Sequence, residues 1–258
     1  MKPLAELDAR GVRAVLFDID DTLTTEGKLT AGAYAALERL RGAGLRTVPV
    51  TGRPAGWCDH IARMWPVDAV VGENGAFYFC HAEGKLHRRY QDSEATRRAN
   101  LERLNIIAKK ILASVPGTAL AADQAYRETD LAIDYCEDVP ALPLEAAERV
   151  AALMRAAGLT AKVSSIHVNG WFGTYDKLAM SRVLFRERFA LDLDAANAAV
   201  VFAGDSPNDQ PMFDFFRNSV GVANVRRFRL EKEPKYVTSK PAGNGFEELA
   251  AHLLKMIG

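Results

Sequence analysis

Two short apolar runs in this sequence each end in a turn rich in aspartate. Residues 14–17 lead into Asp-Ile-Asp-Asp-Thr at 18–22, and residues 198–203 lead into Gly-Asp-Ser-Pro-Asn-Asp at 204–209. A short apolar run bounded by turn-forming residues is typical of a fully buried strand. Ligands of an open α/β sheet bind just outside the carboxyl ends of its strands. The two turns therefore predict where this chain places its chemistry.

Short apolar segments typical of strands alternate with segments of helical periodicity in the first and last parts of the chain. Thr30, for example, is positioned to cap a helix whose residues Leu37 and Leu40 follow helical spacing. The same reasoning predicts helices at 31–42, 55–64, 177–189 and 245–256, and further strands at 45–50, 69–71, 220–223 and 236–238. Strands that alternate with helices form a parallel sheet covered on both faces. We therefore expect an α/β fold with a doubly wound sheet.

The alternation breaks in the middle of the chain. The patterns there predict strands at 77–81, 85–90, 118–122, 131–135 and 160–168, and helices at 93–114 and 144–157. Such segments make a compact α+β module, and the opening rhythm returns after it. We therefore expect residues 1–77 and 174–258 to form the wound sheet, with residues 78–173 inserted as a separate module.

The composition argues against several classes of binding partner for this protein. With 33 basic and 33 acidic residues among 258, the formal net charge is zero, so we expect no broad footprint for nucleic acid or an anionic membrane. No apolar run approaches the ~20 residues of a membrane-spanning helix, and no secretory signal pattern is visible. Three widely spaced cysteines argue against a disulfide framework or a zinc site. We expect a cytoplasmic protein, either a monomer or a homodimer.

The two acidic turns are candidates for a metal site. Clustered carboxylates raise one another's pKa unless a cation shares them, and Mg²⁺ prefers oxygen ligands. Turn formation and helix capping explain either turn equally well when it is taken alone. The pair favours the metal, because Asp18 and Asp205 each end a buried strand and can converge on one cation from distant parts of the chain.

Two further residues are expected at the same edge of the sheet. Thr51 follows the strand at 45–50 and offers a hydroxyl, beside loop amides that can point at an anion; alternatively, it only starts the next helix. Lys177 begins the helix at 177–189, where a cation opposes the helix macrodipole. A functional role would explain the small free-energy cost of that placement. Otherwise, a lysine at this point is expected to be a solvated surface residue.

Four stretches, taken in order, resemble the motifs of the haloacid dehalogenase (HAD) superfamily of phosphotransferases. They are the turn at 18–22, Thr51 within Val-Thr-Gly-Arg, Lys177, and the turn at 204–209. The inserted module, with Glu-Asn-Gly-Ala at 73–76 before it, is similar to the subgroup with a C2-type cap (type IIB), which includes Cof-like sugar phosphatases and sucrose-phosphate phosphatase. The resemblance implies a HAD-like doubly wound core with an inserted α+β cap that shapes substrate specificity.

The resemblance also implies roles for the catalytic residues. Asp18 would be the nucleophile that accepts the phosphoryl group as an aspartyl-phosphate. Asp20 would protonate the leaving alcohol and later take a proton from water. Thr51 and Lys177 would hold the transferring oxygens, and Lys177 would also counter the charge on Asp18.

The implied cofactor is Mg²⁺. Its ligands would be a carboxylate oxygen of Asp18, the main-chain carbonyl of Asp20 and the carboxylate of Asp205, with Asp209 binding directly or through water. Asn208 would orient the site together with Asp209 and contact the substrate.

The cap residues that meet the substrate are harder to recognise. His167, Asn169 and Trp171 alternate within residues 165–171, near the return to the core, so they can share one face and suit a sugar or polyol; packing of the cap and hinge explains His167 and Trp171 equally well. Arg53, Trp57, Asn74 and Arg127 are further candidates for the pocket, although an ion pair with Glu128 or Asp130 explains Arg127 at least as well.

The resulting prediction is a Mg²⁺-dependent phosphatase that hydrolyses a small phosphorylated metabolite, such as a sugar or polyol phosphate. Its partner would be that phosphate ester. The alternatives are a phosphomutase acting on hexose phosphates and a catalytically silent protein that binds phosphoryl groups for regulation.

Overall fold

In the computed structural model, which describes residues 1–257, strand β2 (Ala14–Phe17) lies within a six-stranded sheet. The strand order is β1-β13-β12-β11-β2-β3, and every neighbouring pair is parallel. The other strands are β1 (Lys2–Pro3), β3 (Arg46–Pro49), β11 (Val200–Gly204), β12 (Asn218–Gly221) and β13 (Tyr236–Val237). Because β2 and β11 are direct neighbours, the two acidic turns that follow them leave the sheet side by side.

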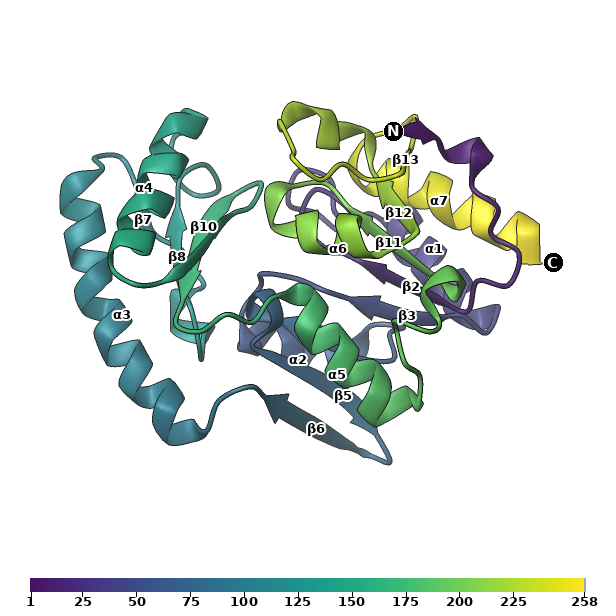
Figure 1. The fold of residues 1–258 in the computed structure, drawn as a ribbon, viewed down its shortest axis with the longest axis horizontal. Coiled ribbons are helices and arrows are strands. Elements are labelled where there is room, and N and C mark those ends of the chain that lie inside the picture. The colour runs from purple at the N-terminus through teal and green to yellow at the C-terminus, as the bar shows by residue number, and fades with distance from the viewer. Residues whose placement is uncertain (258) are drawn as a thin grey trace.

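Helices cover both faces of this sheet, as predicted (Figure 1). Val15 and Phe17 of β2 pack in a cluster with α1, α2 and α7, whereas Leu16 faces the opposite cluster with α5 and α6. These helices are α1 (Ala31–Gly42), α2 (Ala55–Met64), α5 (Lys177–Phe189), α6 (Gln210–Phe215) and α7 (Ala242–Ile257). The apolar run of β2 is continuous because successive side chains enter two different cores.

A hairpin extends the sheet beyond β3. Strand β4 (Val70–Gly72) is bridged to the end of β3 through Val50 and Val71, and it pairs with β5 (Phe77–Ala82), which pairs with β6 (Lys85–Tyr90). The side chains of Phe77 and Phe79 pack in the cluster that contains α2. The hairpin therefore packs on the wound core although most of it falls within residues 78–173. The division into core and cap stays a proposal, and this packing favours a first boundary after residue 90.

The inserted cap is a four-stranded antiparallel sheet covered by two helices (left in Figure 1). Its strand order is β7-β8-β10-β9, and Ile133, Val150 and Val168 lie in a hydrophobic cluster of its own. The elements are α3 (Glu94–Ser114), β7 (Ala119–Leu120), β8 (Leu131–Asp134), α4 (Leu144–Ala156), β9 (Thr160–Val163) and β10 (His167–Trp171).

One predicted strand of the cap was wrong. Residues 160–168 form two antiparallel strands, β9 and β10, and not one. The hydroxyl of Ser164 accepts a hydrogen bond from His167 N, and Ser164 N donates to His167 O, so these residues close a tight turn. Serine hydroxyls stabilise such turns locally, and the alternating pattern on either side of the turn concealed it.

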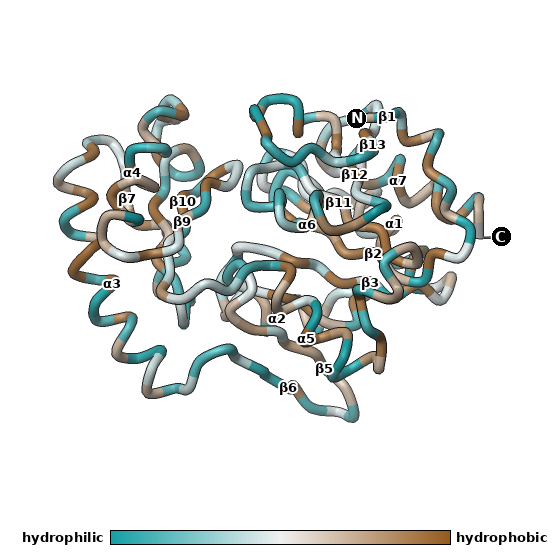
Figure 2. The backbone as a smooth tube through the Cα atoms, in the orientation of Figure 1, coloured by the Kyte–Doolittle hydropathy of each residue, from teal (hydrophilic) through white to brown (hydrophobic). Residues whose placement is uncertain are grey.

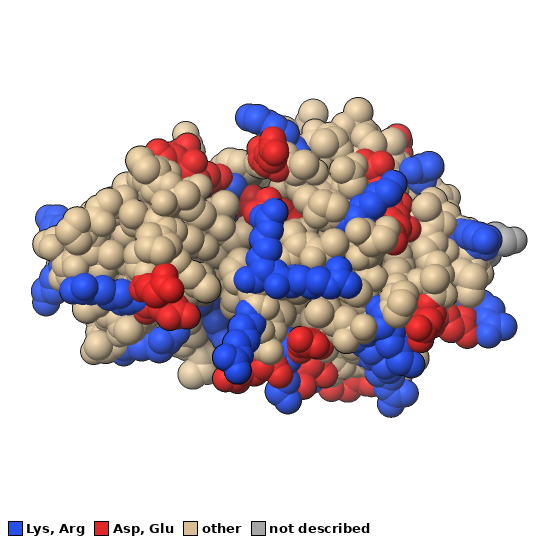
Figure 3. All heavy atoms as spheres, turned by 90° about the horizontal axis from the view of Figure 1, so that it is seen from above, with Lys and Arg blue, Asp and Glu red and all other residues tan. Residues whose placement is uncertain are grey.

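The surface and core follow the expected chemistry. Figure 2 shows hydrophobic residues along β2 and β3 and mainly hydrophilic residues along β6. On the face drawn in Figure 3, basic and acidic side chains are both present and spread over the two lobes. Among the residues that the structure describes, no helix combines the length and the apolar character needed to cross a membrane.

Gly75 marks a close approach between the hairpin segment and the start of α5. Its φ is +105°, and a Cβ added there would lie 2.0 Å from the carbonyl oxygen of Asp176, the N-cap of α5. We expect Gly75→Ala to lower the free energy of unfolding by about 2–5 kcal/mol, because it combines backbone strain with steric overlap. Urea unfolding measures this. Gly158→Ala is the matched control, since Gly158 has φ +85° but, apart from its chain neighbours, no atom of the described residues within 4 Å of the added Cβ. An equal loss of stability in both variants would show that steric overlap at Gly75 is unimportant.

Candidate active site

The two acidic turns meet at the carboxyl edge of the sheet. Asp18 directly follows β2 and Asp205 directly follows β11, and Val15 is paired with Val201 in the register of these strands. One carboxylate oxygen each from Asp18, Asp205 and Asp209 lies within 4.8 Å of the other two. All three side chains are buried. The tertiary structure thus brings together carboxylates that are almost 200 residues apart in the chain.

Lys177 lies beside these carboxylates. Its Nζ is 3.0 Å from Asp18 Oδ1 and donates to Asp209 Oδ1 at 2.7 Å, and its side chain is 1% exposed. Asp176 caps α5 by accepting a hydrogen bond from Ala179 N at 2.8 Å, which places Lys177 in the first turn. Burial acts to lower the pKa of Lys177, but the charges of Asp18 and Asp209 outweigh it and hold that pKa above its ordinary value. Lys177 is therefore a buried cation and not a surface residue.

The carboxylates carry more negative charge than Lys177 balances. Burial, opposed in part by Lys177, raises the pKa of Asp18 to about 7. Burial and the neighbouring charges of Asp209 and Asp18 raise the pKa of Asp205 well above its usual range. Apart from its 3.0 Å ion pair with Lys177, Asp18 Oδ1 has no hydrogen-bond partner among residues 1–257. A set of buried oxygens with excess negative charge is what a hard divalent cation prefers, so these residues fit Mg²⁺.

Asn224 was not anticipated from the sequence. Its Nδ2 donates to Asp205 Oδ2 at 3.0 Å and to the carbonyl oxygen of Asp21 at 2.9 Å, while its Oδ1 accepts from Ala242 N at 2.8 Å. It thereby fixes Asp205 against the first acidic turn and the start of α7. The available signal was its place just after β12, another strand of the same sheet.

Asp209 is oriented from two sides. Its Oδ2 accepts hydrogen bonds from the backbone N–H of Asp205 at 3.0 Å and of Ser206 at 3.3 Å, and its Oδ1 accepts from Lys177. A Cβ at Gly204 would lie 2.4 Å from Asp209 Oδ2, so only glycine lets this carboxylate fold back onto its own turn. The second acidic turn is therefore preorganised.

Thr51, Asn74 and Asn208 form a second polar group beside the carboxylates. Thr51 is fully buried, its hydroxyl accepts from Arg53 N at 3.0 Å, and its carbonyl accepts from Asn74 N at 3.0 Å. Asn208 Nδ2 donates to Asn74 Oδ1 at 3.3 Å. The Nδ2 of Asn74 is a buried donor without a partner among the described residues. Such a donor is available to an anionic ligand.

The three candidate cap residues do share one face, because all lie on β10, but each already has a protein partner. Asn169 Nδ2 donates to Asp130 Oδ2 at 2.9 Å, and Trp171 Nε1 donates to the carbonyl oxygen of Tyr175 at 3.2 Å. His167 Nε2 lies 2.8 Å from a carboxylate oxygen of Glu137. These contacts favour packing of the cap and of its return to the core, and a role of the three in substrate binding stays a prediction.

The cap is fastened to the core by buried charged groups. Glu73 of the core accepts hydrogen bonds from Ala55 N at 2.9 Å and, in the cap, from Glu128 N at 3.0 Å and Thr129 N at 2.7 Å. Arg127 is ion-paired within the cap, as the alternative explanation for it required, and also donates to the carbonyl oxygen of Gly52 at 2.8 Å. The cap thus lies directly against the carboxyl edge of the sheet.

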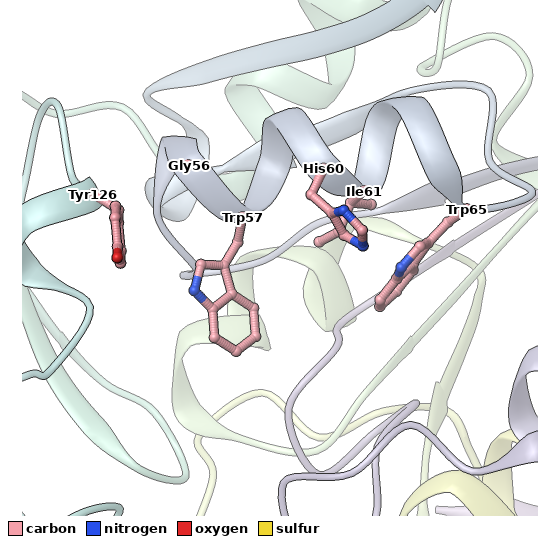
Figure 4. A pocket seen from close by; sticks show the side chains of 6 residues that line it. All are labelled: Gly56, Trp57, His60, Ile61, Trp65 and Tyr126. Atoms are coloured by element: carbon pink, nitrogen blue, oxygen red, sulfur yellow. The ribbon is translucent and has the colours of Figure 1, made fainter.

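Two cavities flank this contact. One of about 300 Å³ is lined by Asp20 and Asp21 of the first acidic turn, by Arg53 of the core, and by Glu137 and its neighbours in the cap. The other, of about 650 Å³, lies on the outer side of α2 and is lined mainly by aromatic and apolar side chains (Figure 4). Asp18, Asp205 and Asp209 line neither cavity, but Asp20 and Asp21, from the same turn as Asp18, line the smaller one. The smaller cavity is therefore the better candidate for the substrate site.

Comparisons with known proteins decide the family. The sequence model of haloacid dehalogenase-like hydrolases matches residues 15–110. A phosphoglycolate phosphatase from Haloarcula marismortui is 30% identical over 243 residues, which cover 92% of this chain and 95% of the relative. The chain belongs to the haloacid dehalogenase-like hydrolases. The prediction that it is a phosphoric monoester hydrolase of the HAD type is thereby confirmed at the level of enzyme class.

Solved structures share the HAD fold. The Thermoplasma acidophilum protein 0175 has a TM-score of 0.71 and 18% identity, with 94% of this chain and 98% of that chain covered. The sucrose-phosphatase of Synechocystis has a TM-score of 0.63 and 14% identity, with 93% and 97% covered. A HAD subclass IIB sugar phosphatase has a TM-score of 0.64 and 14% identity, with 96% and 100% covered. They confirm the predicted HAD-like core with additional antiparallel sheets.

Proposed function

We propose that this HAD-family enzyme is a Mg²⁺-dependent phosphatase that passes the phosphoryl group of a small phosphate ester to Asp18 and then to water. The observation that carries the proposal is the meeting of Asp18, Asp205, Asp209 and Lys177 at one buried point. Asp20, two residues after Asp18, lines a cavity between core and cap. A buried site of this kind strengthens electrostatic stabilisation of the charge that develops on the transferring phosphoryl group.

The reaction has two steps. A carboxylate oxygen of Asp18 attacks phosphorus in line as the bond to the leaving oxygen breaks, and Asp20 gives its proton to the departing alcohol. Water then attacks the aspartyl-phosphate, Asp20 takes the proton from that water, and inorganic phosphate leaves with Asp18 restored. Asp20 lines the cavity and its side chain is 16% exposed, so it has access to both the leaving group and water.

The remaining polar groups would hold the phosphoryl oxygens. Lys177 offers the only ammonium beside Asp18 among the described residues, and Thr51 and Asn74 supply a hydroxyl and an unpartnered amide. Because these oxygens are already held in place, less entropy is lost when the transition state of phosphoryl transfer forms.

The carboxylates of Asp18 and Asp205, with the main-chain carbonyl of Asp20 and the carboxylate of Asp209, are the groups that would hold Mg²⁺. When bound, the ion would reduce the repulsion between the nucleophile and the anionic phosphoryl group.

Removal of the metal gives a direct prediction. We expect EDTA to lower phosphate release by about 100-fold or more, and added Mg²⁺ to restore it, because charge neutralisation by the metal is worth several kcal/mol. Mg²⁺ should also raise the free energy of unfolding of the wild-type protein, by about 2.7 kcal/mol when its concentration is 100 times its dissociation constant. The thermal midpoint should rise accordingly. Asp205→Asn should show little of this shift. Full activity in EDTA would contradict the proposal.

The substrate is proposed only as a class. A small cavity with polar walls suits a sugar or polyol phosphate, and the phosphoglycolate phosphatase among the relatives adds a phosphorylated hydroxy acid to the candidates. A screen of phosphorylated metabolites for inorganic phosphate, with Mg²⁺ present and then chelated, tests the class. Formation of an isomer from a hexose phosphate without phosphate release would indicate a mutase instead. A cytoplasmic location is part of the same proposal.

A further inference from the structure

The guanidinium of Arg53 joins the core to the cap at the entrance of the site. Its Nε donates to both oxygens of Asp20 at 3.0 Å, and its Nη2 donates to Asp20 Oδ1 at 2.8 Å. Toward the cap, Nη2 donates to Glu137 Oε1 at 2.5 Å, and Nη1 donates to Asp123 Oδ2 at 3.2 Å and Glu137 Oε2 at 3.3 Å. The five N–H groups of an arginine are thus all used, which leaves Arg53 no donor for a phosphate oxygen.

The immediate surroundings of Arg53 restrict it further. Its side chain is only 4% exposed, and its guanidinium lies over the ring of Trp57, 4.4 Å from the centroid. Trp57 projects from α2 on the side of the larger cavity, near Tyr126 of the cap (Figure 4). With one face on an aromatic ring and its edges on three carboxylates, Arg53 has one orientation in which all of its partners are satisfied.

Glu137 is held in place from within the cap. It follows β8, where the buried carboxylate of Asp134 accepts hydrogen bonds from the backbone N–H groups of residues 136–138 at 2.8–2.9 Å. Its Oε2 also lies 2.8 Å from His167 Nε2. Burial acts to raise the pKa of Glu137, but the contacts with His167 and Arg53 outweigh it and lower that pKa to about 2. Glu137 therefore presents a fixed carboxylate to the core.

We propose that Glu137 is a positioning residue which, through Arg53, holds Asp20 in its working orientation only while the cap lies against the core. The proposal rests on the proposed function, because it takes Asp20 as the acid–base group. If the cap moves away, Arg53 loses Glu137 and Asp123, and its long side chain regains rotamer freedom together with Asp20. Proton transfer requires the acid within hydrogen-bond reach of the leaving oxygen, so cap closure completes the acid catalyst.

Phenyl phosphates with different ring substituents test this inference. They share the same aryl phosphate scaffold and differ in the acidity of the leaving phenol, and a general acid assists poor leaving groups most. Glu137→Gln keeps the size of the side chain and removes the charge that binds Arg53. We expect kcat/KM for unsubstituted phenyl phosphate to fall by about 10-fold or more, whereas kcat/KM for p-nitrophenyl phosphate changes by less than about 3-fold.

Three further variants calibrate the result. Asp138→Asn changes the same charge at the next residue, which is exposed, and should leave the whole series unchanged. In Asp20→Asn, kcat/KM should depend most steeply on the acidity of the leaving phenol, because general acid assistance is removed. Arg53→Lys should give the same selective loss as Glu137→Gln. If Glu137→Gln does not fold, as judged by thermal unfolding, Arg53→Lys carries the test.

The outcomes separate the two proposals. An equal loss across the series, or no loss, in a folded Glu137→Gln protein overturns the positioning role, since a binding or purely structural role would act on all substrates alike. If Asp20→Asn itself leaves the dependence on leaving-group acidity unchanged, the assignment of Asp20 in the proposed function is what fails.

Discussion

Asp18→Asn is expected to lower phosphate release by about 10⁴-fold or more. The amide keeps the shape of the carboxylate but cannot attack phosphorus, and losing a nucleophile typically removes most of an enzyme's rate enhancement. Steady-state release of inorganic phosphate from the best substrate of the metabolite screen is the measurement. Undiminished release would remove Asp18 as the nucleophile.

The same variant should fold normally, which makes the kinetic result interpretable. Burial raises the pKa of Asp18 to about 7, so a neutral amide removes a carboxylate whose burial costs free energy. Lys177 keeps its 2.7 Å contact with Asp209. We therefore expect the urea midpoint of Asp18→Asn to be equal to that of the wild type or slightly higher; a large drop would show that the loss of activity is a loss of fold.

Lys177→Met is expected to have the largest effect on stability. Methionine fills a similar volume, but the change leaves Asp18, Asp205 and Asp209 as buried carboxylates without their cation. Removing one member of a buried ion pair typically costs about 3–5 kcal/mol, because the remaining charge is uncompensated. Urea unfolding without metal measures the loss, and turnover should be abolished as well because the phosphoryl oxygens lose their ammonium.

Two comparisons make this prediction specific. Lys109→Met, at an exposed position on α3, should change the free energy of unfolding by less than about 0.5 kcal/mol. Mg²⁺ should recover part of the loss in Lys177→Met, since a bound cation replaces some of the missing positive charge. A Lys177→Met protein as stable as the Lys109→Met control would show that the carboxylates are not ionised together in the folded protein.

Local patterns were sufficient for most elements of the core. The helix at 31–42 is capped by Thr30, whose hydroxyl accepts from Ala33 N at 3.2 Å, and the helices at 55–64 and 177–189 have the predicted bounds. Capping and helical periodicity act within one or two turns, so a single sequence reveals them. The hairpin of β5 and β6 was recognised as two strands, but nothing local showed that Phe77 and Phe79 would pack on the core.

The sequence by itself determined that Asp18 and Asp205 end buried parallel strands, and strand ends of one sheet share an edge, so their convergence followed from topology alone. Only the tertiary structure decided what surrounds them. Asn224 reaches Asp205 from the short helical turn after β12, and Arg53 binds partners 33, 70 and 84 residues away. Such pairings depend on how the cap docks against the core. That docking is set by long-range packing, which no periodicity or spacing within a segment encodes.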